Sequence, residues 1–231
     1  MVRPRLSHSF LPVFRNCFFM GVMALLASVA YVQPLIRAEP HRFAIVPALG
    51  VGIKDGKAIG TVHYIAIQVD QDLRGQGPRI QFSEMLRGSA VGDQWKDGVR
   101  AATIAAAAAT GEDYRNWTVT IKNRSYTNFT EGSSASGVIA VGIMAAWRGD
   151  KLRPDVALTG VMTPQGHLEN VDALPAKLTG AADAHMRVML VPKGQARTAE
   201  WDLIEQGLQR NVTVIEVGSL LEAYAWMVAP H

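Results

Sequence analysis

The stretch Thr130–Gly137 contains a serine, Ser134, in a setting that favours nucleophilic chemistry. It lies between a polar, turn-like segment, 123–130, and an apolar run of small residues, 138–147, which predicts a buried helix. The first backbone N–H groups of a helix have no partner inside the helix, and the helix dipole favours negative charge there. A serine alkoxide and a tetrahedral oxyanion would both be stabilised at such a junction. Ser134 is therefore a candidate catalytic nucleophile.

A structural role for Ser134 is the competing interpretation. Serine is a preferred N-cap of helices. The small neighbours Gly132 and Gly137 suit close helix packing as well as the close approach of a substrate. The octapeptide alone favours the capping role, and the sequence beyond it reverses that preference.

Three further segments have a distinctive order and spacing. They are Arg153–Gly160 (RPDVALTG), Val161–Gly166 (VMTPQG) and Asn170–Leu178 (NVDALPAKL). Together with the Ser134 segment they resemble the proteolytic domain of Lon-type proteases. That family has an acidic-Gly-Pro-Ser-Ala-Gly motif, an Arg-x-Asp-Val-Ala-Met-Thr-Gly-Glu-Ile-Thr strand pair and a Gly-Gly-Leu-Lys-Glu-Lys-Leu helix start. The resemblance is specific from Glu131 to Pro192 and weaker on either side.

The resemblance implies a Ser/Lys catalytic dyad. The family serine falls on Ser134, and the second lysine of the helix start falls on Lys177 without a gap. The threonine that supports this lysine falls on Thr159. A desolvated Lys177 with a lowered pKa would take the proton from the Ser134 hydroxyl and pass it to the leaving amine. Backbone N–H groups of Ser134 and of the preceding loop, 131–133, would form the oxyanion hole.

The chain departs from the family pattern at several positions. The acidic residue is Glu131 rather than Asp, the motif proline is Ser133, and Ser136 stands where the family has glycine. Val161 replaces a glutamate, and the segment 117–122 lacks the histidines of the family's matching strand. These changes leave the dyad positions intact and bear on the loop geometry and on substrate preference.

The elements that must position these residues follow from the periodicity of the apolar residues. Strands are expected at 57–69, 80–83, 117–122, 156–162, 167–171, 188–191 and 212–217, and 43–51 is expected to pair as an edge strand. Helices are expected at 92–110, 138–147, 174–185, 198–209 and 220–227. Lys177 would lie in the first turn of its helix. These elements predict a single α+β domain.

Residues 1–38 are expected to lie outside this domain. Basic residues precede an uncharged apolar run, 17–32, as in a secretory signal, and 28–30 fits the small-x-small pattern before a cleavage site. A membrane anchor is the alternative, because the run extended to 17–36 is long enough to span a bilayer. Both interpretations place residues 39–231 outside the cytoplasm, either periplasmic or secreted, or anchored to the membrane.

Composition argues against several other functions. The chain has 23 Lys and Arg against 20 Asp and Glu. Four of the arginines lie in residues 1–38, which contain no acid, so residues 39–231 carry 19 basic and 20 acidic side chains. This near-neutral balance gives no support to nucleic-acid binding. Cys17 is the only cysteine, which excludes a disulfide, and the histidines lack metal-ligand spacing. Neither a metal nor a cofactor is expected.

The function that the resemblance implies is a serine endopeptidase acting on polypeptides. Gly56-Lys57-Ala58 lacks an upstream glycine, at Val51, and a following Ser or Thr, so the chain contains no P-loop. We therefore expect cleavage without ATP, of flexible or unfolded polypeptides. Full-length Lon enzymes form rings through this domain, so the resemblance also implies a homo-oligomer.

Two rival functions stay open. Residues 132–136 are one residue from the Gly-x-Ser-x-Gly elbow of α/β-hydrolases, which would make the chain an esterase. The elbow would require partners such as His167 or His185 with Asp172 or Asp183, but no buried strand leads into Ser134. A non-catalytic binding or scaffold protein on a Lon-like fold is the second rival, because a fold does not fix a function.

Overall fold

The fold is seen in a computed structural model that describes residues 42–83, 90–125 and 129–229. These residues belong to one compact unit, Pro40–His231. The expected signal or anchor, 1–38 with its apolar run 17–36, lies outside the described residues. Among the helices that are described, none is both long and apolar enough to cross a membrane.

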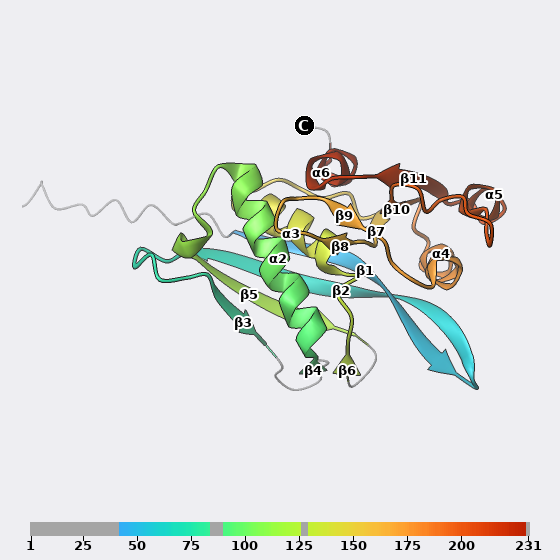
Figure 1. Ribbon diagram of the computed structural model, residues 1–231, viewed down its shortest axis with the longest axis horizontal. Helices are drawn as coiled ribbons and strands as arrows, with labels where there is room; N and C mark the ends of the chain where they lie inside the picture. Colours follow the sequence, from blue (N-terminus) through green and yellow to red (C-terminus); the bar gives the residue numbers. More distant parts are fainter. Residues whose placement is uncertain (1–41, 84–89, 126–128, 230–231) are drawn as a thin grey trace, which may run out of the picture. The chain divides into compact units, whose positions relative to one another are not determined.

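A seven-stranded mixed sheet, in the order β11-β10-β7-β1-β2-β5-β3, forms the centre of the domain (Figure 1). Its strands are β1 (Phe43–Lys54), β2 (Lys57–Gln71), β3 (Arg79–Phe82), β5 (Trp117–Arg124), β7 (Val156–Leu158), β10 (Val188–Pro192) and β11 (Thr213–Val217). The pairs β1–β2 and β2–β5 are antiparallel, and the remaining pairs are parallel. Two small ribbons flank the sheet: β4 (Ala90–Val91) with β6 (Phe129–Thr130), and β8 (Val161–Met162) with β9 (Leu168–Glu169).

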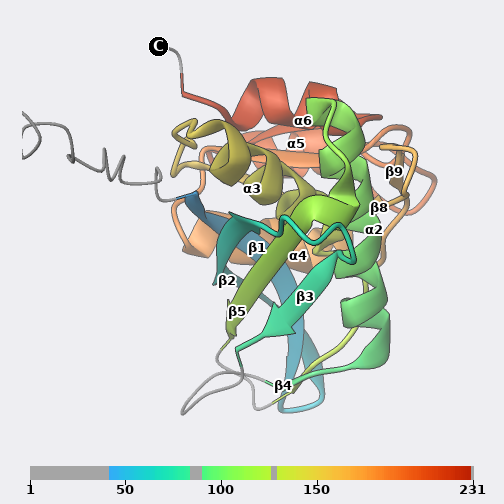
Figure 2. The same cartoon turned by 90° about the vertical axis from the view of Figure 1, so that its left-hand side faces the viewer.

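Helices cover both faces of this sheet. On one side α2 (Asp93–Thr110) packs on α3 (Ser136–Arg148), α3 lies on β1 and β2, and α6 (Leu220–Met227) contacts both helices (Figure 2). The other layer contains α4 (Leu174–Asp183), which lies on β2 and β1, and α5 (Leu203–Leu208), which lies on β11. A short 3-10 helix, η1 (Tyr114–Asn116), leads into β5.

Alternate residues of the buried strands supply two hydrophobic cores. In β10, Val188 and Leu190 belong to the core that contains α3, whereas Met189 and Val191 belong to the core that contains α4. Successive strand side chains point to opposite faces of a sheet. The two cores therefore lie on opposite sides of the sheet. The mixed sheet and its helices form a single domain, which is consistent with the expected α+β class.

The expectation that 43–51 forms an edge strand is wrong. β1 lies in the interior of the sheet, between β7 and β2. Val46 and Ala48 are buried in one core and Leu49 in the other, so both faces of β1 are covered. The parallel pairing with β7 reaches only as far as Ala48, which faces Leu158. Beyond Ala48, β1 pairs with β2 alone within the part of the chain that is described, and its other edge is open.

Other elements differ from the expectation in extent. The strand expected at 156–162 is interrupted at Thr159 and Gly160, which separates β7 from β8. The helix expected at 198–209 begins only at Leu203, because the Asp202 side chain caps it by accepting hydrogen bonds from the N–H groups of Ile204 and Glu205. The structure also contains β4, β6 and η1, which were not expected. The expected elements themselves follow one another in the expected order.

Candidate active site

Ser134 lies two residues before α3, in the tight turn that starts the helix. The N-cap of α3 is Ala135, without a side-chain hydrogen bond. The serine with a structural role at this helix start is Ser136. Its hydroxyl donates to the Ser133 carbonyl and accepts from the Met162 N–H, both at 2.7 Å. The capping interpretation is therefore wrong for Ser134.

The backbone around Ser134 offers unused donors. Among the described residues, the N–H groups of Ser133, Ser134 and Ala135 have no hydrogen-bond acceptor, and all three residues line one cleft. Clustered N–H groups at a helix start are the donors that an oxyanion hole requires. The expected oxyanion loop thus contains backbone N–H groups that are free to bind an oxyanion. Glu131, the acidic residue of this loop, acts instead as a hydrogen-bond acceptor for the backbone. Glu131 Oε1 accepts the N–H groups of Trp95, at 3.3 Å, and Gly132, at 3.0 Å.

Lys177 lies in the first turn of α4, as expected, and its side chain is only 4% exposed. Two glycines bring α4 directly onto the sheet. A Cβ at Gly60 of β2 would overlap the Ala176 carbonyl, and one at Gly180 would overlap the Gly60 backbone. This close contact removes water from around the lysine.

Burial lowers the pKa of Lys177 from 10.5 to about 8, and the nearby Asp172 carboxylate opposes this shift by favouring the charged form. A lysine in this range exchanges protons near neutral pH, as a general base must. The expectation of a desolvated lysine agrees with its surroundings.

Thr159 connects the lysine to the serine loop. Lys177 Nζ donates to Thr159 Oγ1 at 3.1 Å, and Thr159 Oγ1 donates to the Ser134 carbonyl at 3.3 Å. The next residue, Gly160, donates its N–H to the same carbonyl at 2.9 Å and accepts from Gly137 N–H at 3.0 Å. The interruption between β7 and β8 therefore fixes both the serine turn and the lysine side chain.

Ser134 and Lys177 line a cleft of about 420 Å³. One wall is the open edge of β1, residues Leu49–Gly52, and the others are the serine loop, 130–135, and the segment 170–173 before α4. The structure thus brings together the residues that the resemblance singled out. Their catalytic roles stay predictions.

The histidines that the rival esterase needs are not in this cleft. His167 and His185 are exposed and do not line it. The histidine that does line it is His63 on β2, which is buried and whose pKa is lowered to about 4 by burial. Sequence reasoning missed His63, because its only signal is the alternation of β2. Within the described ranges no group of three or more His, Cys, Asp or Glu side chains could hold a metal ion.

Most of the residues of this site lie in a part of the chain that is similar to known proteins. Residues 84–226 match the family model described as the Lon protease (S16) C-terminal proteolytic domain. A protein named Lon protease 2 from Herpetosiphon aurantiacus is 33% identical over 87 residues, which are 38% of this chain and 10% of that protein.

Two proteins named Archaeal Lon protease are also similar. The one from Archaeoglobus fulgidus is 27% identical over 49% of this chain and 18% of its own length. The one from Methanothermobacter thermautotrophicus is 24% identical over 72% of this chain and 27% of its own length. The chain therefore spans between 10% and 27% of the length of these curated relatives.

Proposed function

Because this chain belongs to the family of Lon protease C-terminal proteolytic domains, we propose that it is a serine endopeptidase with Ser134 as nucleophile and Lys177 as general base. The observation that carries the proposal is the hydrogen-bond path from Lys177 Nζ through Thr159 Oγ1 to the Ser134 carbonyl. It joins a buried lysine to the serine turn of the same cleft.

In the proposed first step, neutral Lys177 accepts the hydroxyl proton while Ser134 Oγ attacks the scissile carbonyl carbon. With a pKa of about 8, roughly a tenth of the molecules hold neutral lysine at pH 7. The oxyanion would be bound by the unused N–H groups of residues 133–135. The Lys177 ammonium then donates its proton to the leaving amine, and water releases the acyl group through the same base.

The substrate would be an extended polypeptide. The open edge of β1, Leu49–Gly52, offers backbone groups with which an extended chain can pair as an added strand. Such pairing would align the scissile bond beside Ser134 without any requirement for a particular side chain. A folded protein rarely exposes an extended segment of this kind, whereas unfolded chains and mobile loops do.

We further propose that cleavage is independent of ATP, since the sequence contains no P-loop. The basic and apolar segment within residues 1–38 supports action outside the cytoplasm, with the chain exported or anchored. Self-association into a ring belongs to the same proposal and rests on the family resemblance.

The decisive experiment incubates the purified protein with an unfolded, casein-like substrate and with a tightly folded protein, with and without ATP. We expect cleavage of the unfolded substrate alone, unchanged by nucleotide and absent in Ser134→Ala. A fluorophosphonate probe should label the wild type at Ser134. A protein that neither reacts with the probe nor cleaves would be a binding protein, and one that hydrolyses only small esters would be an esterase.

A further inference from the structure

The side chain of Gln195, in the turn after β10, forms a two-point contact with the backbone of one residue. Its Oε1 accepts the N–H of Val171 at 2.9 Å, and its Nε2 donates to the Val171 carbonyl at 2.9 Å. Gln195 is buried at 9% exposure, and Val171 at 6%. The amide therefore pairs with Val171 as a neighbouring strand residue would, using both of its polar atoms.

Val171 leads directly into the helix that carries Lys177. Asp172 follows, and then Ala173, the N-cap of α4, which has φ 57° and ψ 33° and makes no side-chain cap. The Ala173 carbonyl accepts the N–H of Lys177 at 3.1 Å. An alanine in the left-handed region is strained, so the surrounding structure must hold it there. The bonds from Gln195 fix the backbone two residues earlier.

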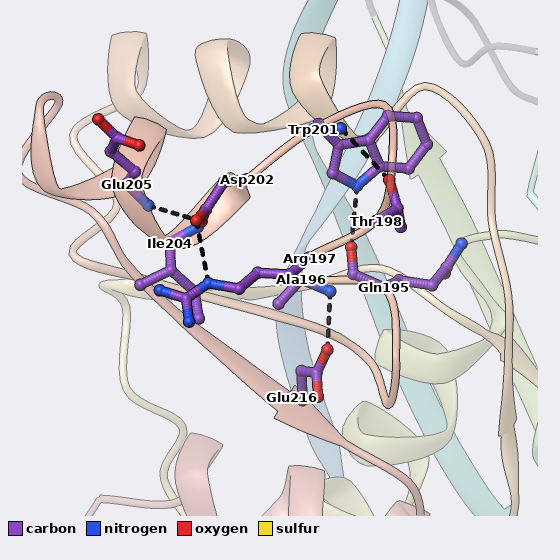
Figure 3. A network of polar contacts seen from close by, with 9 residues as sticks. All are labelled: Gln195, Ala196, Arg197, Thr198, Trp201, Asp202, Ile204, Glu205 and Glu216. Carbon is purple, nitrogen blue, oxygen red and sulfur yellow. Dashed lines mark hydrogen bonds and ion pairs between the residues drawn. The ribbon is translucent and has the colours of Figure 1, made fainter.

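Gln195 is itself fixed to the sheet (Figure 3). Trp201 Nε1 donates to the Gln195 carbonyl at 2.9 Å, and Gln195 N–H donates to the Pro192 carbonyl at the end of β10 at 3.2 Å. The next N–H, of Ala196, donates to Glu216 Oε1 on β11 at 2.7 Å. A continuous set of hydrogen bonds thus runs from β10 and β11 through Gln195 to the start of α4.

We propose that Gln195 is a positioning residue that holds Lys177 in its buried place beside Thr159 by pinning Val171 through its side-chain amide. The inference rests on the proposed function in that Lys177 is taken as the base. The positioning itself is a property of the fold and can be measured without any cleavage.

Loss of the Gln195 contact would free the start of α4 and admit water to Lys177 Nζ. Burial is the main cause of the lowered pKa of Lys177, so the pKa would rise toward its ordinary value. The other titratable groups that line the cleft are Asp172, Glu131 and His63, from three different segments, and the substitution leaves all three in place.

The test compares Gln195→Met, which has a similar volume and no paired amide, with Gln195→Asn, whose amide is too short to reach both Val171 atoms. The matched control is Thr179→Val, which removes the bond from Thr179 Oγ1 to the Pro175 carbonyl on the exposed side of α4. The pKa of Lys177 is measured in a Ser134→Ala background by its rate of reaction with an amine-selective reagent over a series of pH values.

We expect both Gln195 variants to raise the pKa of Lys177 by roughly one pH unit or more, a tenfold loss of neutral lysine at neutral pH. In Gln195 variants that retain Ser134, cleavage should be reduced at neutral pH and should recover in alkaline buffer, where Lys177 is again neutral. The control should leave the pKa unchanged. Trp201→Phe removes only the hydrogen bond to the Gln195 carbonyl and should raise the pKa of Lys177 by a smaller amount. It is the milder substitution and serves as the test variant if Gln195→Met does not fold.

An unchanged Lys177 pKa in a folded Gln195 variant would overturn the inference, and so would a uniform loss of activity at every pH. Absence of cleavage by the wild type would overturn the proposed function instead, because the amine-labelling experiment does not depend on cleavage.

Discussion

The Glu131 carboxylate fills the space that a side chain on Gly92 would need: a Cβ at position 92 would overlap it. Gly92 is the N-cap of α2 and provides no side-chain cap, and Glu131 Oε1 accepts the N–H of Trp95 in the first turn. A carboxylate beside these N–H groups also complements the helix dipole. The serine loop thus caps a helix that lies far from it in the sequence.

We therefore predict that Gly92→Ala lowers the reactivity of Ser134. The new methyl group displaces the Glu131 carboxylate and shifts the serine loop. The loss of this cap of α2 should lower the free energy of unfolding by about 1 kcal/mol. The readouts are the rate of fluorophosphonate labelling and the thermal unfolding temperature. Gly111→Ala, in the left-handed C-cap of the same helix, is the control. It should lower the unfolding temperature and leave the labelling rate of the folded protein unchanged.

Substitutions in the dyad should separate its two members from the histidines. Ser134→Ala and Lys177→Ala should each reduce peptide cleavage by roughly a thousandfold or more. Lys177→Arg should not restore activity, because a guanidinium does not give up its proton. Thr159→Val removes the acceptor of Lys177 and should weaken cleavage while leaving labelling measurable. His167→Gln and His185→Gln should remain active, and an inactive histidine variant beside an active Lys177→Ala would refute the assignment.

The rate of cleavage should rise with pH through about 8, the pKa of Lys177. Because the Asp172 carboxylate raises that pKa, Asp172→Asn should move the rising limb of kcat/KM toward lower pH. Asp183→Asn, at the far end of α4 and outside the cleft, is the matched control and should leave the profile in place. A profile that does not move in Asp172→Asn, or that moves equally in both variants, would contradict this prediction.

Stability should depend on pH in the same region. Between about 8 and 10.5, the folded and ordinary pKa values of Lys177, the unfolded chain binds more protons at this residue than the folded chain does. The free energy of unfolding therefore rises with pH across this window, by at most about 3 kcal/mol. Lys177→Met should remove this rise, as measured by urea unfolding at several pH values. An equal rise in the free energy of unfolding in the wild type and in Lys177→Met would show that titratable groups other than Lys177 cause it.

Ala173→Gly should stabilise the domain by about 1 kcal/mol, because glycine adopts a positive φ without the strain that alanine carries there. Ala182→Gly, inside the same helix, should destabilise it by a similar amount. Urea unfolding of the two variants gives the comparison. A loss of stability in Ala173→Gly would mean that the left-handed N-cap carries no strain.

Local sequence patterns were enough to place Lys177 in the first turn of a helix, and the pattern around Ser134 was enough to place it before another. They were not enough to place β1 inside the sheet, since its partner β7 lies about a hundred residues away and no local pattern encodes that pairing. The same limit applies to Glu131 and Gln195. Each acts on a backbone distant in sequence, and its residue type alone suggests an ordinary loop side chain.

The two cores on opposite sides of the sheet have a consequence for the folding chain. The helix that begins beside Ser134 is packed in one core, and Leu174 and Leu178 pack the helix of Lys177 into the other. A chain in which only one layer has formed has a nucleophile without a base, or a base without a nucleophile. Under the proposed mechanism, the protein is therefore inactive until both layers have formed, and a partly folded copy cannot cleave other copies that are still extended.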